Sequence, residues 1–206
     1  MKIDPSKIPF ADTHKLMIGS IVPRPIAFVS TISKEGKNNI APFSYFNGVC
    51  SKPPTIMFAP ARRGWDGKEK DTLTNIRDNN QFVVNIVSEG FAEKMVMCST
   101  DFDSNIDEFE ISGLNPIASD RINPPRLLES KVSFECELNQ IVEIGNSDAG
   151  SGFIVIGTVL LFHIDDEVYE NGHILLDKLE PIGRLAGNKY TRPSDVFEIS
   201  RKIKPG

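Results

Sequence analysis

The sequence predicts a mainly β fold with a few peripheral helices, arranged as a closed or nearly closed antiparallel barrel. Two observations support this prediction: short segments rich in β-branched and aromatic residues outnumber helical segments, and turn residues separate them at close intervals. A GxGxxG pattern is absent, so a parallel dinucleotide-binding sheet is not supported. A chain of 206 residues commonly forms one domain, and we expect a single domain over residues 1–206.

The expected elements can be followed along the chain. We expect strands at residues 25–33, from Ile40 onward, and at 55–60, 81–87, 131–144 and 152–165. Apolar residues spaced three and four apart predict two short helices, at 71–80 and 91–99. Residues 101–128 contain one glycine and three prolines, which predicts a long surface segment with room for a single helical turn.

Charge and hydropathy argue against several classes of function. Lysine and arginine number 23 against 28 acidic residues, and a formal net charge of -5 gives no general attraction to nucleic-acid phosphates. The longest apolar run, at 153–162, is well short of the roughly 20 residues needed to cross a bilayer, so we expect no membrane association. Residues 1–10 carry charges and prolines where a secretory signal needs an apolar core, and we expect a cytoplasmic protein.

Neither a disulfide framework nor a metal site is expected. The three cysteines are far apart and lack CxxC spacing, so we expect buried or inert thiols at Cys50, Cys98 and Cys136. His163 precedes several acidic residues, but alternation along a strand sends it and Ile164 to opposite faces. The acids resemble a solvated strand end, and we assign no metal ligands.

Residues 38–54, NNIAPFSYFNGVCSKPP, combine small, polar and aromatic side chains in a strand that runs into a turn. The limited bulk at Ala41, Pro42 and Ser44 would let a flat ligand reach the main chain, and the neighbouring aromatic residues would form apolar walls. An ordinary edge strand with core aromatics explains the same composition, and composition alone favours that alternative.

A cluster of cations precedes the first expected helix. Four of them lie within nine residues, ahead of a helix start near Thr72: Arg62, Arg63, Lys68 and Lys70. Exposed amides at a helix start, a hydroxyl group and cations make a phosphate site without a glycine-rich loop. Taken alone, the cluster is better explained as a solvated charged loop. Together with the strand at 38–54, it favours a ligand with a flat ring at one end and phosphate at the other.

Several separated motifs carry a resemblance to a known family. They are the stretch from VPRPIAFVSTIS through NNIAPFSYF to TIMFAP, then KDTLTNI with FVVNIV, and finally PIGRLAGNKY. In this order, from about Ile18 to Tyr190, the chain resembles the flavin reductase-like family of FMN-binding split barrels, which includes flavoredoxins and reductase components of two-component monooxygenases. The resemblance implies a core at about 18–190, a six-stranded antiparallel Greek-key barrel, and a homodimer that binds FMN near the subunit interface.

The resemblance also implies which residues hold the flavin. The ring and ribityl chain would lie against Ser30, Thr31, Asn38, Ala41, Pro42, Phe43 and Ser44, with Asn47 as a further contact. The phosphate would be held by Arg63, Lys70, Asp71 and Thr72. Arg184 and Tyr190 would lie near the flavin, often from across the dimer, although Ala186 stands where many relatives carry glycine.

The function implied is an NADH- or NADPH-dependent flavin reductase, in which nicotinamide passes a hydride to flavin N5. FMN carries the chemistry, so catalysis is mainly positioning and no catalytic side chain is assigned. Two alternatives stay open: a flavoredoxin-like electron carrier reduced by a ferredoxin-type partner, and a non-enzymatic FMN store or sensor. A monooxygenase is the other partner that the resemblance suggests.

Overall fold

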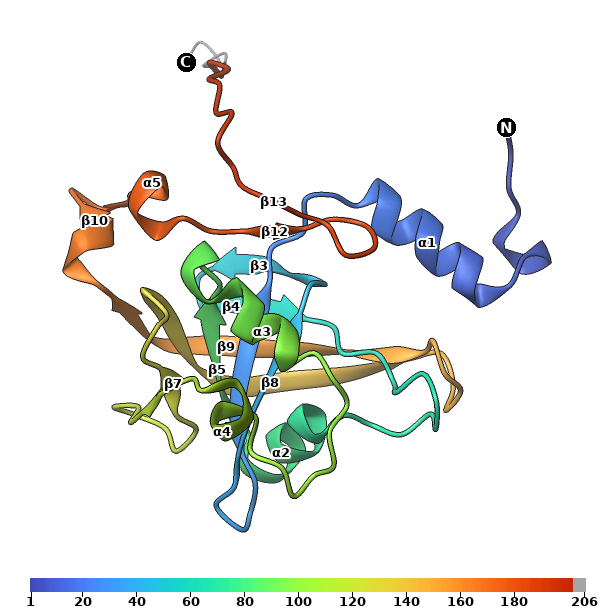
Figure 1. Ribbon diagram of the computed structural model, residues 1–206, viewed down its shortest axis with the longest axis horizontal. Coiled ribbons are helices and arrows are strands. Elements are labelled where there is room, and N and C mark those ends of the chain that lie inside the picture. The colour runs from blue at the N-terminus through green and yellow to red at the C-terminus, as the bar shows by residue number, and fades with distance from the viewer. Residues whose placement is uncertain (202–206) are drawn as a thin grey trace.

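A seven-stranded antiparallel sheet forms the centre of the fold, in the strand order β2-β1-β5-β8-β9-β4-β3 (Figure 1). The computed structural model describes residues 1–201, so the end of the domain expected over 1–206 lies outside the described residues. The strands are β1 (Ala27–Ile32), β2 (Asn38–Phe43), β3 (Phe46–Ser51), β4 (Pro54–Phe58), β5 (Gln81–Ile86), β8 (Val132–Ile144) and β9 (Gly152–Ile164). The predicted mainly β fold is confirmed.

Helices and short two-stranded pairings surround this sheet. The helices are α1 (Phe10–Ser20), α2 (Asp71–Asn79), α3 (Ala92–Met97), α4 (Glu108–Ser112) and α5 (Leu176–Leu179), with 3-10 turns at Pro5–Lys7, Glu89–Phe91 and Asp166–Val168. The short pairings join β6 (Pro116–Ile117) to β7 (Arg126–Leu127), β10 (Tyr169–Glu170) to β11 (His173–Ile174), and β12 (Gly183–Arg184) to β13 (Tyr190–Thr191). No helix within residues 1–201 has both the length and the apolar character to cross a bilayer.

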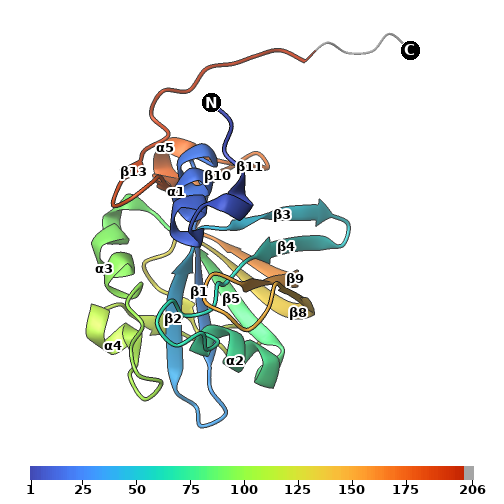
Figure 2. The ribbon, with the colours of Figure 1, turned by 90° about the vertical axis from the view of Figure 1, so that its right-hand side faces the viewer.

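Besides α5 and the short two-stranded pairings, β3 and α1 are elements that the sequence patterns did not predict. β3 adds a seventh strand to the six expected, because the chain turns back and pairs with β4 from Phe46↔Phe58 to Ser51↔Pro54. Figure 2 shows this β3–β4 hairpin projecting from the barrel. β3 has no buried residue, so it lacks the one-sided alternation that marks a half-buried strand. α1 also buries no residue, and it therefore shows no core-facing stripe.

The barrel interior is packed around aromatic rings. Phe58 lies 5.1 Å from Phe43 and 5.5 Å from Phe82 between ring centroids, in tilted and edge-to-face arrangements. Gly157 on β9 leaves room for this packing, since a Cβ atom there would collide with the ring of Phe82. Alternation along β1 sends Ala27 and Val29 into this cluster, while Phe28 packs on the other face beneath α3 and α4.

One buried arginine joins the end of α1 and the β12–β13 hairpin to the barrel. Arg24 is 4 % exposed and donates to the main-chain oxygens of Ile18 at 2.8 Å, Ile21 at 2.7 Å and Leu185 at 3.1 Å. Its Nε also donates to Ser44 Oγ at 3.3 Å, beyond the end of β2. The C-terminal end of α1 and the β12–β13 hairpin are therefore held against the end of β2.

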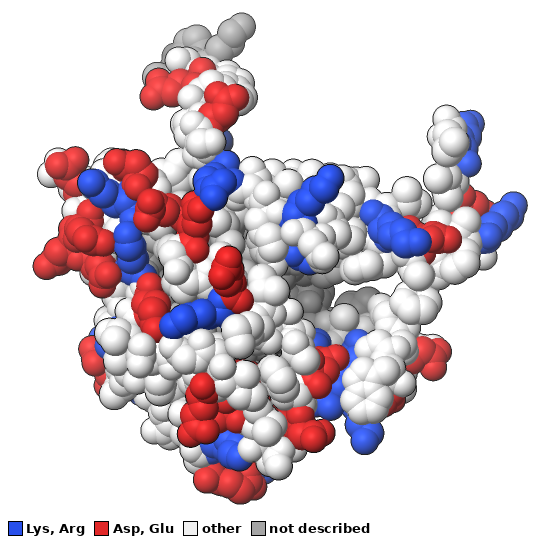
Figure 3. Space-filling view, in the orientation of Figure 1, with Lys and Arg blue, Asp and Glu red and all other residues white. Residues whose placement is uncertain are grey.

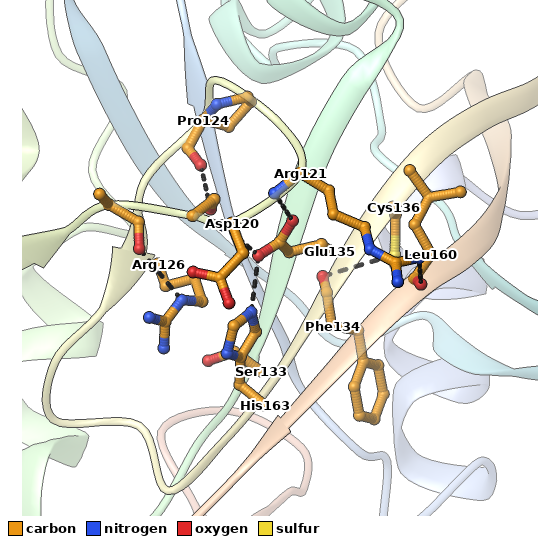
Figure 4. Close-up of polar contacts among 12 residues, drawn as sticks. Asp120, Arg121, Pro124, Arg126, Ser133, Phe134, Glu135, Cys136, Leu160 and His163 are labelled. Carbon is orange, nitrogen blue, oxygen red and sulfur yellow. Dashed lines mark hydrogen bonds and ion pairs between the residues drawn. The ribbon is translucent and has the colours of Figure 1, made fainter.

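A second buried charge fastens the loop between β6 and β7 to the barrel (Figure 4). Glu135 is fully buried and accepts hydrogen bonds from the amides of Asp120 at 2.7 Å and Arg121 at 2.8 Å. His163 Nε2 lies 2.6 Å from Glu135 Oε1. Burial raises the pKa of Glu135, but these hydrogen bonds outweigh burial and hold the pKa below its usual value.

Ligating atoms of Asp120, Glu135 and His163 all lie within 4.8 Å of one another, a grouping that sequence reasoning did not foresee. The acidic residues after His163 do not join this group. The absence of a metal site stays a prediction.

Glu135→Gln should lower the free energy of unfolding by about 1.5–3 kcal/mol, because the amide nitrogen of glutamine cannot accept from a buried main-chain N–H. Urea unfolding would measure the change. Glu137→Gln is the matched control, since Glu137 lies on the same strand and is exposed. The free energies of unfolding of the two variants should become equal as pH falls below about 4. A carboxyl group with a lowered pKa stabilises the fold only while it is ionised. Equal stability of both variants at neutral pH would contradict the role of Glu135.

Candidate functional site

Two adjoining cavities lie beside the end of β2 and share Pro42 and Ser99 as lining residues. The small cavity, of about 40 Å³, lies between β2, the start of α2, and the segment 98–102 that follows α3. The large cavity, of about 580 Å³, lies between α3 and the β12–β13 hairpin. Figure 3 shows the surface hollowed between these two elements, while acidic side chains gather at the β10–α5 end of the molecule.

Most of the predicted site residues line these two cavities. The small cavity is lined by Ala41, Pro42, Phe43, Arg63, Lys70, Asp71 and Thr72. The large cavity is lined by Pro42, Ser44, Arg184 and Tyr190. Residues that are far apart in the sequence are thus brought to one place. All four expected phosphate residues line the small cavity, but so do three of the expected ring residues, Ala41, Pro42 and Phe43. Ser44, Arg184 and Tyr190 line only the large cavity.

Four predicted residues do not line either cavity. Ser30 and Thr31 are fully buried, and Ser30 Oγ donates to the main-chain oxygen of Pro125 at 2.5 Å. Asn38 lines a neighbouring cavity beside the β1–β2 turn, and Asn47 lies on β3, where its Oδ1 accepts from the amide of Gly48. Their contact with a ligand stays a prediction.

Asn39, which the sequence reasoning missed in favour of Asn38, is the polar centre of the small cavity. It is 8 % exposed, and its Oδ1 accepts from Thr31 Oγ1 at 3.1 Å and Thr72 Oγ1 at 2.9 Å. Its Nδ2 donates to Glu108 Oε1 at 2.9 Å. The single hydroxyl hydrogen of Thr72 is therefore used internally, and its side chain can only accept from a ligand. The cross-strand pairing of Thr31 with Asn39 was the available signal, once the hairpin register was known.

The start of α2 presents free donors to the small cavity. No side chain caps this helix, and within residues 1–201 the amides of Asp71 and Thr72 have no hydrogen-bond acceptor. Arg63 Nη2 donates to Asp71 Oδ1 at 3.0 Å, but its buried Nε has no partner among the described residues. Lys70 Nζ lies 2.5 Å from Asp101 Oδ1. The main-chain amides and cations together suit an anion.

Burial perturbs the acids of the small cavity. It raises the pKa of Asp71, against the opposing effect of the Arg63 charge. Burial also raises the pKa of Glu108 to about 7, although hydrogen bonds from the amide of Ile40 and from Asn39 oppose it. Cys98 has its pKa raised to about 11 by burial and stays a thiol. Cys98 and Cys136 are buried as expected, whereas Cys50 is exposed.

The large cavity has a more apolar lining than the small one. Met95 and Val96 of α3 form one wall, a contribution that sequence reasoning did not assign to the site. Arg184 and Tyr190 form the opposite wall, where the Arg184 guanidinium lies 4.5 Å from the centre of the Tyr190 ring. This arrangement can hold a planar group, with an anionic tail directed past Pro42 toward the small cavity.

Comparisons with known proteins agree with this geometry. Residues 18–181 match the family described as "Flavin reductase like domain". An uncharacterized protein of Aquifex aeolicus (strain VF5) is 43% identical over 180 residues, which cover 87% of this chain and 89% of the relative.

Two solved structures show the same fold. Nitrilotriacetate monooxygenase component B from Bacillus cereus superposes with a TM-score of 0.92 and 36% identity, over 97% of this chain and 98% of that protein. A protein from Shewanella frigidimarina NCIMB 400, described as a putative flavin reductase with split barrel domain, superposes with a TM-score of 0.83 and 17% identity, over 98% and 100% of the two chains. At that identity the second structure shows the fold alone, which confirms the split barrel. The chain belongs to the flavin reductase-like family.

Proposed function

We propose that the protein is a cytoplasmic FMN-binding oxidoreductase that accepts a hydride from NADH or NADPH. One observation carries this proposal: a cation-lined helix start and a larger cavity with an apolar wall adjoin at Pro42 and Ser99. FMN has a planar ring at one end and a phosphate at the other, and the two cavities match these ends in chemistry. Family membership supports a flavin as the ligand.

The residues present fit this cofactor. The phosphate would be held by the amides of Asp71 and Thr72 together with Arg63 and Lys70, and the unpartnered Arg63 Nε is a donor that needs such an acceptor. The ring would lie against the main chain around Pro42, with α3 on one side and the β12–β13 hairpin on the other. When bound, FMN supplies the redox chemistry, and the protein supplies orientation and exclusion of water.

Two copies of the chain are proposed to form the working unit, with a monooxygenase or a ferredoxin-type protein as redox partner. No residue of α1 is buried, and α1 exposes three large apolar side chains, Phe10, Leu16 and Met17, with exposed Ile21 directly after it. β3 is an exposed edge strand, and no other strand within residues 1–201 pairs with its outer side. A second copy that covered α1 and β3 would remove both surfaces from water.

Sedimentation velocity should therefore report a particle of two 22.8 kDa chains. Met17→Glu should shift it toward one chain, because the new charge would have to be desolvated in an apolar interface. Lys15→Glu, an exposed substitution on the same helix, should leave the assembly unchanged. A monomeric wild-type protein at micromolar concentration would refute the dimer.

Hydride transfer from a nicotinamide predicts that the purified protein loaded with FMN loses its flavin absorbance on anaerobic addition of NADH or NADPH. The measurement is stopped-flow absorbance near the flavin band, with each nucleotide tested separately. Reduction only by a reduced ferredoxin-type protein would support the electron-carrier alternative and contradict the nicotinamide step. Failure of the colourless protein to take up FMN would contradict the whole proposal.

Lys70→Ala should weaken FMN binding by about 1.5–3 kcal/mol, or roughly tenfold to a hundredfold in Kd, because it removes one charge-assisted contact to phosphate. Fluorescence titration of FMN measures this loss. Riboflavin, which lacks the phosphate, should bind wild type and variant equally. Lys68→Ala is the matched control, since Lys68 is exposed in the same loop. An unchanged Kd for FMN would remove Lys70 from the phosphate site.

A further inference from the structure

Glu108, at the first position of α4, is a buried acid in the wall of the small cavity. Only 6 % of the residue is exposed. Its Oε1 accepts from Asn39 Nδ2 at 2.9 Å, and its Oε2 accepts from the amide of Ile40 at 3.3 Å. Neither the sequence motifs nor the phosphate site proposed above assigns a task to this carboxyl group.

The two cations that line the small cavity are each paired with an acid, whereas Glu108 is not paired with a cation among the described residues. Arg63 is paired with Asp71 at 3.0 Å, and Lys70 is paired with Asp101 at 2.5 Å. Glu108 has no cationic partner within residues 1–201. When Glu108 is ionised, a phosphate entering the cavity meets one uncompensated negative charge, in a place where burial limits screening.

Protonation of Glu108 removes this charge near neutral pH. Its pKa is raised to about 7, first by burial and further by the Asp71 carboxylate. The other titratable or charged groups at the cavity are Arg63, Lys70, Asp71, Cys98 and Asp101, with Asp103 close enough to raise the pKa of Asp71. Cys98, with a pKa of about 11, is neutral over the same range, whereas Glu108 changes charge around pH 7.

We propose that Glu108 takes up a proton when a phosphate group enters the small cavity, so that flavin retention weakens as pH rises through neutrality. The inference rests on the proposed binding of FMN, and it adds a proton to that equilibrium. Because the bound state holds more protons than the free state, affinity falls with rising pH. Protonation at Oε2, on the side of the longer bond to Ile40, would leave Oε1 free to accept from Asn39. The network that holds Thr72 would then remain in place.

Isothermal titration calorimetry of FMN into the intact protein at about pH 7.5 tests the proposal in two buffers that differ in ionisation enthalpy. At this pH free FMN is almost wholly dianionic, since the second pKa of its phosphate is about 6, so the ligand contributes few protons. Wild type should take up a measurable fraction of a proton per flavin. Glu108→Gln should take up none, and Glu110→Gln, an exposed change on the same helix, should behave as wild type.

The affinities provide a second readout. Suppose that bound phosphate makes the acidity constant of Glu108 about tenfold smaller. The Kd of wild type for FMN should then rise about tenfold more than the Kd of Glu108→Gln as the pH goes from acidic to basic. Riboflavin should show no such difference, because it brings no phosphate. Equal proton uptake by wild type and Glu108→Gln, or no uptake by wild type, would overturn the inference while flavin binding itself stood. Absence of FMN binding in wild type would overturn the inference together with the proposed function.

Discussion

The buried side-chain amide of Asn39 is the interaction on which the arrangement of the site depends. It joins four elements, because it accepts from hydroxyl groups on β1 and α2 and donates to a carboxylate on α4, while belonging to β2 itself. Each partner is buried, so each would lose a hydrogen bond that water could not readily replace if the amide moved. The start of α2 is thereby held at a fixed place beside β2, where its free amides face the small cavity.

This constraint explains why an anion site can exist without a glycine-rich loop. The donors of the helix start are main-chain groups whose position follows from the placement of α2, and the cations Arg63 and Lys70 are held by acids rather than by a ligand. These ion pairs keep two cations ordered in a partly buried place, and the attraction to the acids offsets part of the cost of removing the cations from water. The same acids make the cavity nearly neutral, and the charge state of one further carboxyl then decides how well it accepts phosphate.

Where the signal was local, the sequence patterns picked out residues that line the small cavity. The run from Arg63 to Thr72 precedes a helix, and helix starts and clustered cations can be recognised without knowledge of the fold. Alternation placed β1, β5, β8 and β9 close to their observed bounds. Sequence reasoning named Asn38 and missed Asn39. The β1–β2 register and the position of α4 decide which of these two side chains faces α2, and a local sequence pattern shows neither. Glu108 and Arg24 were missed for the same reason, since their partners are distant in sequence.

By itself, the sequence determined the mainly β fold, the location of the cation cluster and the family to which the chain belongs. These properties depend on short-range patterns and on the order of motifs along the chain, which can be recognised without the structure. Only the tertiary structure decided that β3 is an edge strand, that Ser30 points away from the cavities, and that α3 supplies an apolar wall. Packing also decided that Glu108 is buried without a cationic partner within residues 1–201, because burial and pairing depend on residues that are distant in the sequence.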